Sequence, residues 1–207
     1  MPALPAVPRY LILLITVLWT APLAAEALDA LRERLAPLNS LQGRFDQQVL
    51  SQDGEVLERS SGRFMLLRPG YFYWRIEAPD DQLLVAADNR LWHYDADLET
   101  ANRRPIRDEQ QGGPIAILSG DIDRLADYYY VRDLGAGRFR LEPREADRQF
   151  EAVELAFTDA APLSMSVEDR LQQTTRIEFA AIELNPPLTA DDFVFEPPDG
   201  VDVYYHD

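Results

Sequence analysis

The amino-acid sequence predicts a mainly β protein (class α+β) in which one antiparallel sheet is accompanied by about three short helices. Segments with apolar residues at every second position recur along most of the chain, separated by turn-forming pairs such as Asp53-Gly54. The helical spacing of three to four residues is confined to 28–38 and 114–129. Because no internal repeat divides this pattern, we expect a single domain over residues 28–207.

The first residues have the pattern of a secretory signal peptide. Arg9 precedes the apolar run YLILLITVLW, and APLAAEA then supplies an Ala-x-Ala cleavage site. A membrane anchor is the less favoured alternative, because the run is shorter than the about 20 apolar residues of a spanning helix and ends at Pro22. We expect removal of residues 1–27, by cleavage after Ala27 or alternatively after Ala25, and a mature chain in the periplasm.

Charge and cysteine content exclude several classes of protein. The formal net charge is −16, from 20 Lys and Arg against 36 Asp and Glu. This charge disfavours nucleic acid and anionic membrane surfaces as partners. The chain has no cysteine, so its fold depends on an apolar core instead of disulfides, and no N-terminal cysteine can carry a lipid.

The first half of the chain predicts one helix followed by a series of short strands. Leu28, Leu31, Leu35 and Leu38 lie on one helical face of 28–38, and the helix should end near Pro37. The apolar period then changes to two. The predicted strands are 42–50, 55–59, 62–68, 71–77, 82–87 and 90–95, with a weaker strand at 99–103.

The second half predicts the remaining helices and strands. Residues 104–113 are polar and rich in glycine, which is typical of a loop. The stretch PIAILSGDIDRLADYY predicts two short helical pieces, with Pro114 in a first turn and Asp121 as an N-cap. Further strands are predicted at 128–134, 138–143, 150–157, 164–168 and 173–184, and short edge strands at 192–198 and 200–205.

Several predicted strands are apolar on both faces. Residues 64–67 (FMLL), 71–74 (YFYW) and 82–87 (QLLVAA) lack the alternation of a strand with one wet face. Something must cover the second face, and the sequence offers only about three short helices for this. Either the helices complete a tight core, or the sheet curves around a cavity that the helices cover and that receives an apolar ligand.

The residues that enzymes and metal sites need are scarce. His93 and His206 are the only histidines, and neither has neighbours at the spacing of a metal site or a catalytic triad. No GxSxG, HExxH, Walker-type or GxGxxG motif is present. Acidic pairs such as Asp80-Asp81 are typical of turns and caps. We therefore predict a protein that is not an enzyme and has no metal, no cofactor and no catalytic residue.

A collinear set of motifs resembles the LolA family of lipoprotein carriers. The motifs are FDQQV at 45–49, GRFMLLRPGYFYW at 62–74, PDDQLLV at 79–85, LWHYDADLE at 91–99, ILSGD at 117–121 and FVFEPPDGVDV at 193–203. Each motif is unspecific alone, but their shared order is specific. The resemblance implies an incomplete antiparallel β-barrel of about 11 strands, with a lid of about three short helices over a hydrophobic cavity.

The resemblance also implies a function and partners. Members of the family carry triacylated lipoproteins from an ATP-driven releasing complex of the inner membrane to the outer-membrane lipoprotein receptor LolB. We expect a monomer that binds no nucleic acid. The alternative is a similar carrier or sensor for another acylated lipid, such as a glycolipid or polyene lipid. This chain departs from the family pattern at Asp88-Asn89, where Asp-Gly is usual, and its tail leaves open whether an additional C-terminal strand forms.

Side-chain alternation assigns residues to the expected cavity. Because Phe72, Trp74 and Ile76 form the drier face of their strand, we place them inward and let Tyr71 and Tyr73 turn their hydroxyl ends to water. Plain core packing is the alternative role for these inward side chains. The expected cavity residues are Phe64, Leu66, Phe72, Trp74, Ile76 and Leu84 on strands, and Leu31, Leu35, Ile115 and Leu118 on helices.

Arg68 is the expected latch of the lid. The resemblance implies that its guanidinium points inward and hydrogen-bonds the lid helices in the empty protein, and five N–H donors allow several such bonds. A surface position before a turn is the alternative. Burial of acyl chains contributes about 0.8 kcal/mol per CH₂, which would make binding of three chains nearly irreversible. Opening of the lid would offset this gain and permit release.

Overall fold

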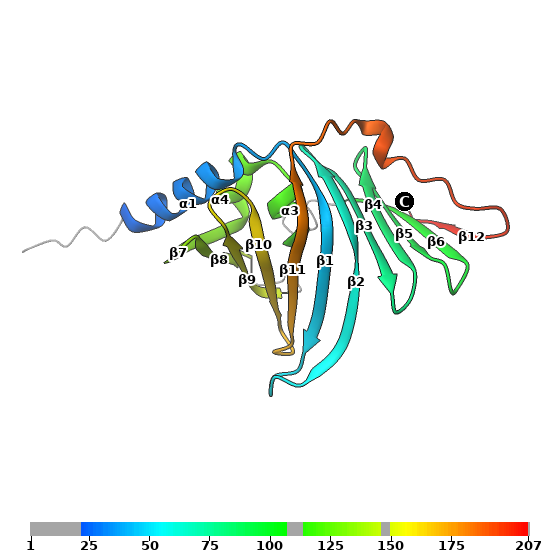
Figure 1. Cartoon of the computed structure of the whole chain (residues 1–207), viewed down its shortest axis with the longest axis horizontal. Coiled ribbons are helices and arrows are strands. Elements are labelled where there is room, and N and C mark those ends of the chain that lie inside the picture. The colour runs from blue at the N-terminus through cyan, green and yellow to red at the C-terminus, as the bar shows by residue number, and fades with distance from the viewer. Residues whose placement is uncertain (1–21, 107–113, 146–149, 207) are drawn as a thin grey trace, which may run out of the picture.

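One open sheet of twelve strands forms the body of the protein (Figure 1). The computed structural model describes residues 22–106, 114–145 and 150–206. The strand order is β12-β6-β5-β4-β3-β2-β1-β11-β10-β9-β8-β7, and within the described residues all neighbours are antiparallel except β12 and β6. Since β12 and β7 lie at opposite edges, the curved sheet stays open, as expected of an incomplete barrel.

The strands agree with the predicted ones over most of their length. The largest difference in the first half is β2, a single strand where the sequence predicts two, because Ser60 and Ser61 continue the pairing with β1. The strands are β1 (Ser40–Leu50), β2 (Val56–Leu67), β3 (Tyr71–Ala78), β4 (Gln82–Ala87), β5 (Arg90–Asp95), β6 (Thr100–Pro105), β7 (Tyr129–Gly135), β8 (Arg138–Pro143), β9 (Phe150–Phe157), β10 (Pro162–Asp169), β11 (Thr174–Leu184) and β12 (Asp202–Tyr205).

Gly62 allows two aromatic rings to meet across β2. Phe45 on β1 lies opposite Gly62, and its ring stacks on Trp74 of β3 with centroids 3.6 Å apart. A Cβ atom at Gly62 would collide with the backbone oxygen of Arg75 and would come within 3.0 Å of the Phe45 ring. The missing side chain therefore makes room for a stacked pair at the centre of the core.

Helical segments cover the inner face of the sheet. They are α1 (Pro22–Leu35), α3 (Pro114–Ser119), η1 (Ile122–Arg124) and α4 (Leu125–Tyr128). Together they bury a hydrophobic cluster in which Leu31 and Leu35 of α1 have no exposed surface. The side chain of Asp121 accepts a hydrogen bond from the backbone N–H of Asp123 (2.9 Å), which confirms the predicted cap.

The ends of two predicted segments differ from the structure or fall outside it. α1 begins at Pro22, six residues before the predicted start, and ends at Leu35. It spans the two expected cleavage positions, and Ala27 is buried in the core. Most of the expected signal peptide and most of the loop 104–113 lie outside the described residues, so processing of the N-terminus stays a prediction.

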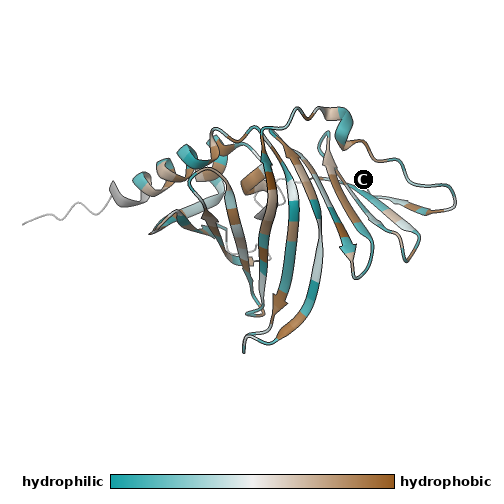
Figure 2. Ribbon diagram, viewed as in Figure 1, coloured by the Kyte–Doolittle hydropathy of each residue, from teal (hydrophilic) through white to brown (hydrophobic). Residues whose placement is uncertain are grey.

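The C-terminal segment covers the outer face of β3, β4 and β5. The sequence predicts an edge strand at 192–198, but η2 (Ala190–Phe193) and unpaired extended residues occur there. Further along the tail, β12 pairs with β6 in parallel. The tail therefore does form an additional strand. Figure 1 shows this segment running from the end of β11, past β3 and β4, to the edge of the sheet. Hydrophobic residues occur along it (Figure 2).

This cover packs against the rings of the two tyrosines, whose hydroxyl groups form exposed hydrogen bonds with Asp88 and Arg63. Phe193 is 1% exposed and packs with Leu83 and Val85, and its ring centroid lies 5.5 Å from that of Tyr71. Tyr73 is partly buried in the same cluster. The second apolar face of β3 and β4 is thus explained by the tail, whereas their first face belongs to the core beneath the helices.

Replacement of Phe193 tests the cover on the outer face. We expect Phe193→Ala to lower the free energy of unfolding by about 3–4 kcal/mol, because it removes a buried ring from the cluster. Val194→Ala is the matched control, since Val194 is 68% exposed and should change stability by less than about 0.5 kcal/mol. Urea unfolding followed by tryptophan fluorescence measures both. Equal losses in the two variants would contradict the assignment.

Candidate functional site

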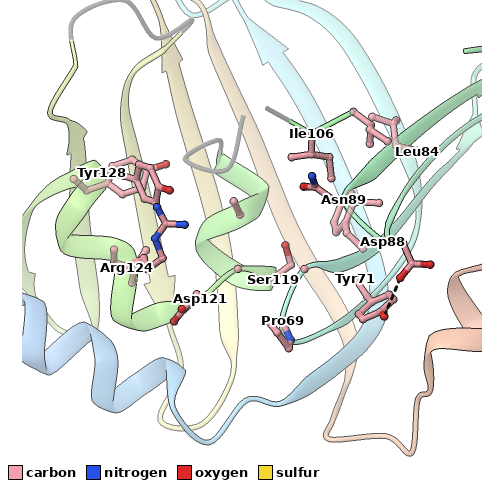
Figure 3. A pocket seen from close by; sticks show the side chains of 18 residues that line it. Pro69, Tyr71, Leu84, Asp88, Asn89, Ile106, Ser119, Asp121, Arg124 and Tyr128 are labelled. Carbon is pink, nitrogen blue, oxygen red and sulfur yellow. Dashed lines mark hydrogen bonds between the residues drawn. The ribbon is translucent and has the colours of Figure 1, made fainter. Parts of the chain in front are cut away.

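A cavity of about 490 Å³ lies between the inner face of the sheet and the helical cover (Figure 3). Its sheet wall comes from β3, β4 and β5, and its opposite wall comes from the segment α3, η1 and α4. Apolar side chains predominate, and polar groups gather at the rim. The lining residues are Pro69, Gly70, Tyr71, Phe72, Leu84, Ala86, Asp88, Asn89, Leu91, Ile106, Ala116, Ser119, Gly120, Asp121, Arg124, Leu125, Tyr128 and Tyr129.

The structure divides the residues expected in the cavity into two groups. Phe72 and Leu84 line the cavity. The side chain of Ile115 lies outside the described part of the structure. The other expected residues pack in the closed core beside the cavity, with Ile76 only partly buried: Phe64, Leu66, Trp74, Ile76, Leu31, Leu35 and Leu118.

Several lining residues were not expected from the sequence. Leu91 pairs diagonally with Leu84 and lies on the same inward face, so alternation along β5 could have identified it. Tyr128 ends the short helix α4 and Tyr129 begins β7, and no spacing in the sequence indicates that both line the cavity. Ile106 is placed by a backbone hydrogen bond from its N–H to the carbonyl of Asn89 (2.9 Å), which continues the pairing of β5 with β6.

Arg68 joins the two longest covering helices to the sheet. Its Nε donates to the carbonyl of Leu118 (2.8 Å), and its Nη1 donates to the carbonyl of Leu35 (2.6 Å). These carbonyls lie in the last turns of α3 and α1, where backbone acceptors lack intrahelical partners and the helix end is partially negative. A single cation therefore satisfies the C-terminal ends of two helices, as the resemblance implied.

The guanidinium of Arg68 is only partly compensated. Its Nη2 atom is buried and has no hydrogen-bond partner among the described residues. Burial lowers the pKa of Arg68 to about 10, so the side chain stays protonated at neutral pH. Desolvation of an unpaired charge is costly, and the two carbonyl contacts offset this cost only in part. The closed arrangement therefore retains a destabilised group at its centre.

The turn that follows Arg68 adds backbone contacts to the same joint. The N–H of Arg68 donates to the carbonyl of Asn39 (2.9 Å), and the N–H of Gly70 donates to the carbonyl of Ser119 (2.7 Å). Gly70 has φ +86°, a conformation that side chains disfavour. The turn thus ties the end of β2 to the connection after α1 and to the last residue of α3.

The rim of the cavity is shaped by a tight turn between β4 and β5. Asp88 and Asn89 have φ values of 48° and 59°, which are the values of a type I′ hairpin. Asn89 therefore adopts the positive φ expected at the position where Gly is usual. The hydroxyl of Tyr71 donates to the carboxylate of Asp88 (3.4 Å; dashed line in Figure 3).

The described residues contain no cluster of three or more His, Asp or Glu side chains placed to hold a metal ion. Within the same residues, no helix is both long enough and apolar enough to cross a membrane. A concave, mainly apolar surface with a few polar groups in its lining is the arrangement that binds the hydrocarbon part of a ligand.

Comparisons with known proteins agree with these features. The family model described as outer membrane lipoprotein carrier protein LolA matches residues 36–196. An outer-membrane lipoprotein carrier protein from Halorhodospira halophila is 35% identical, with 94% of each chain covered. One from Alkalilimnicola ehrlichii is 37% identical over 80% of this chain and 78% of its own.

A solved structure supports the fold at low sequence identity. An uncharacterized conserved protein from Thermus thermophilus is 16% identical and has a TM-score of 0.53, over 88% of this chain and 99% of its own. The family match covers most of the described sheet, the joint at Arg68 and the cavity. The chain belongs to the LolA family of outer membrane lipoprotein carrier proteins.

Proposed function

We propose that this protein carries lipoproteins through the periplasm by enclosing their acyl chains. The observation that carries the proposal is an apolar cavity whose helical cover is tied to the sheet by the incompletely compensated Arg68. The names of its relatives from Halorhodospira and Alkalilimnicola support a lipoprotein cargo. We propose a monomeric carrier that has no enzymatic activity and uses no cofactor.

The size of the cavity requires the cover to move during loading. A methylene group needs about as much space as a water molecule, roughly 30 Å³. The cavity of about 490 Å³ therefore accommodates on the order of one long acyl chain in the closed form. A triacylated cargo needs more space. We propose that separation of α1 from the sheet supplies it, exposing core residues such as Leu31, Phe64 and Trp74.

Arg68 sets the balance between loading and release in this proposal. Acyl burial contributes about 0.8 kcal/mol per CH₂, so three chains could contribute tens of kcal/mol, beyond any reversible affinity. Opening breaks the Arg68 contacts to Leu35 and Leu118 and separates packed helices. This cost weakens net binding. The cargo would come from an ATP-driven complex of the inner membrane and pass to the receptor LolB in the outer membrane.

Identification of the captured material tests the proposed cargo. The protein, purified from its native periplasm under mild conditions, should co-purify with triacylated lipoproteins, because their acyl chains gain free energy from burial in an apolar cavity. Mass spectrometry of the bound fraction measures this. Capture of glycolipids or polyene lipids in their place would instead support the alternative carrier or sensor function.

Replacement of Arg68 tests the proposed latch. We expect Arg68→Leu to accept lipoprotein but to pass it to the receptor at least about ten-fold more slowly. Without the Arg68 contacts, the closed, empty form is less stable relative to the open, loaded form. Arg68→Lys should transfer cargo at an intermediate rate, since a single ammonium group cannot reproduce the planar guanidinium with its several N–H donors. Transfer of labelled lipoprotein from the loaded carrier to LolB measures the effect.

Arg59→Leu is the matched control, because Arg59 lies exposed on the same strand, β2. It removes the same charge and should transfer cargo at the parental rate. The latch assignment fails if Arg68→Leu also transfers at that rate.

A further inference from the structure

A second, polar pocket adjoins the apolar cavity on the inner face of the sheet. Its volume is about 330 Å³, and it shares Leu84 and Leu91 with the cavity. The remaining lining residues are His93 on β5, Asn102 and Arg104 on β6, and His206 after β12. The shared leucines place the two pockets side by side, so two parts of one ligand could be bound next to each other. We call these four polar residues the polar annex.

Strand alternation and the C-terminal strand bring the annex together. His93 is paired with Leu84 on one side and with Asn102 on the other, so all three lie on the inward face. The parallel pairing of β12 with β6 carries His206 to Asn102, and His206 Nε2 lies 3.4 Å from Asn102 Oδ1. Both histidines of the chain therefore meet in one place, although 113 positions separate them in the sequence.

The annex has positive and hydrogen-bonding groups but no acidic group in its lining. Arg104 forms no ion pair within the described residues. The nearest acidic side chain on the same face of β5 is Asp95, and its carboxylate accepts hydrogen bonds from Gln82 Nε2 (3.2 Å) and from the N–H of Leu98 (3.0 Å). Among the described residues, the guanidinium of Arg104 therefore has no acidic partner, in a chain of net charge −16.

We propose that the polar annex binds an anionic group attached close to an acyl chain, while the chain itself lies in the apolar cavity. Arg104 supplies the charge, and His93, Asn102 and His206 supply hydrogen bonds to the same oxygens. The anion is a phosphate or a carboxylate. Its source is a phospholipid headgroup, or an acidic residue near the acylated end of the cargo. The inference rests on the proposed function, since it uses the same cavity.

Binding of two soluble amphiphiles separates the annex from the cavity. Calorimetric titration below the micellar concentration compares dodecyl phosphate with uncharged dodecyl maltoside. The wild-type chain should bind dodecyl phosphate more tightly. Arg104→Gln should weaken that binding by about ten-fold or more, the effect of one charge-assisted hydrogen bond, and leave dodecyl maltoside unchanged. Arg176→Gln, an exposed position on β11, removes the same charge and should alter neither.

The outcomes distinguish failure of the annex from failure of the carrier. If the wild-type chain binds both amphiphiles equally, or if Arg104→Gln weakens both to the same extent, the polar annex does not bind the anion. Acyl binding in the apolar cavity is then still supported. If the wild-type chain binds neither amphiphile, the acyl-binding function fails, and this inference fails with it.

A second pair of ligands identifies the source of the anion. N-palmitoyl-Gly-Asp-Ser-amide and N-palmitoyl-Gly-Asn-Ser-amide differ only in one carboxylate. A preference for the Asp peptide that disappears in Arg104→Gln assigns the annex to the cargo. A preference confined to dodecyl phosphate assigns it to a phospholipid headgroup. The absence of both preferences overturns the proposal.

Discussion

The buried guanidinium of Arg68 is the constraint on which the closed form depends. It donates to the last turns of two helices that are distant in sequence, at Leu35 and Leu118. It also leaves one nitrogen without a partner among the described residues. The same side chain therefore contacts both covering helices and remains incompletely compensated between them. Since a packed apolar lid of this size would otherwise be difficult to open, this compromise suits a carrier that must load and release.

The two faces of the sheet at β3 and β4 pack against different parts of the protein. The inner face of β3 and β4 continues from the closed core into the cavity, whereas their outer face is sealed by the C-terminal segment through Phe193. This seal covers the strands behind the cavity, and the proposed opening involves only the helices in front of it. The same segment ends in β12, which completes the polar end of the concave surface with His206. The tail thus supports the sheet and contributes to a pocket.

Local patterns predicted much of the fold, and long-range contacts account for the remainder. Alternation predicted most strands, the inward face with Phe72 and Trp74, and the family motifs placed Arg68. The residues 192–198 look like a strand because aromatic and β-branched side chains alternate there, yet they use these side chains to cover another strand. The positions of the lining tyrosines and of the polar annex depend on long-range contacts of turns and of the parallel strand β12. Local periodicity in the sequence does not encode such contacts.

The distance between the helical cover and the sheet shows directly whether the cover opens when acylated cargo binds. Because the chain has no cysteine, spin labels can be attached at Glu33→Cys on α1 and Asp97→Cys after β5, both exposed positions. Pulsed electron resonance then gives their separation with and without a triacylated lipopeptide. If the cover opens on loading, the distance is longer with the lipopeptide than without it. If Arg68 holds the cover closed, the distance is also longer in Arg68→Leu without ligand. An unchanged distance in the loaded protein would contradict the proposed opening.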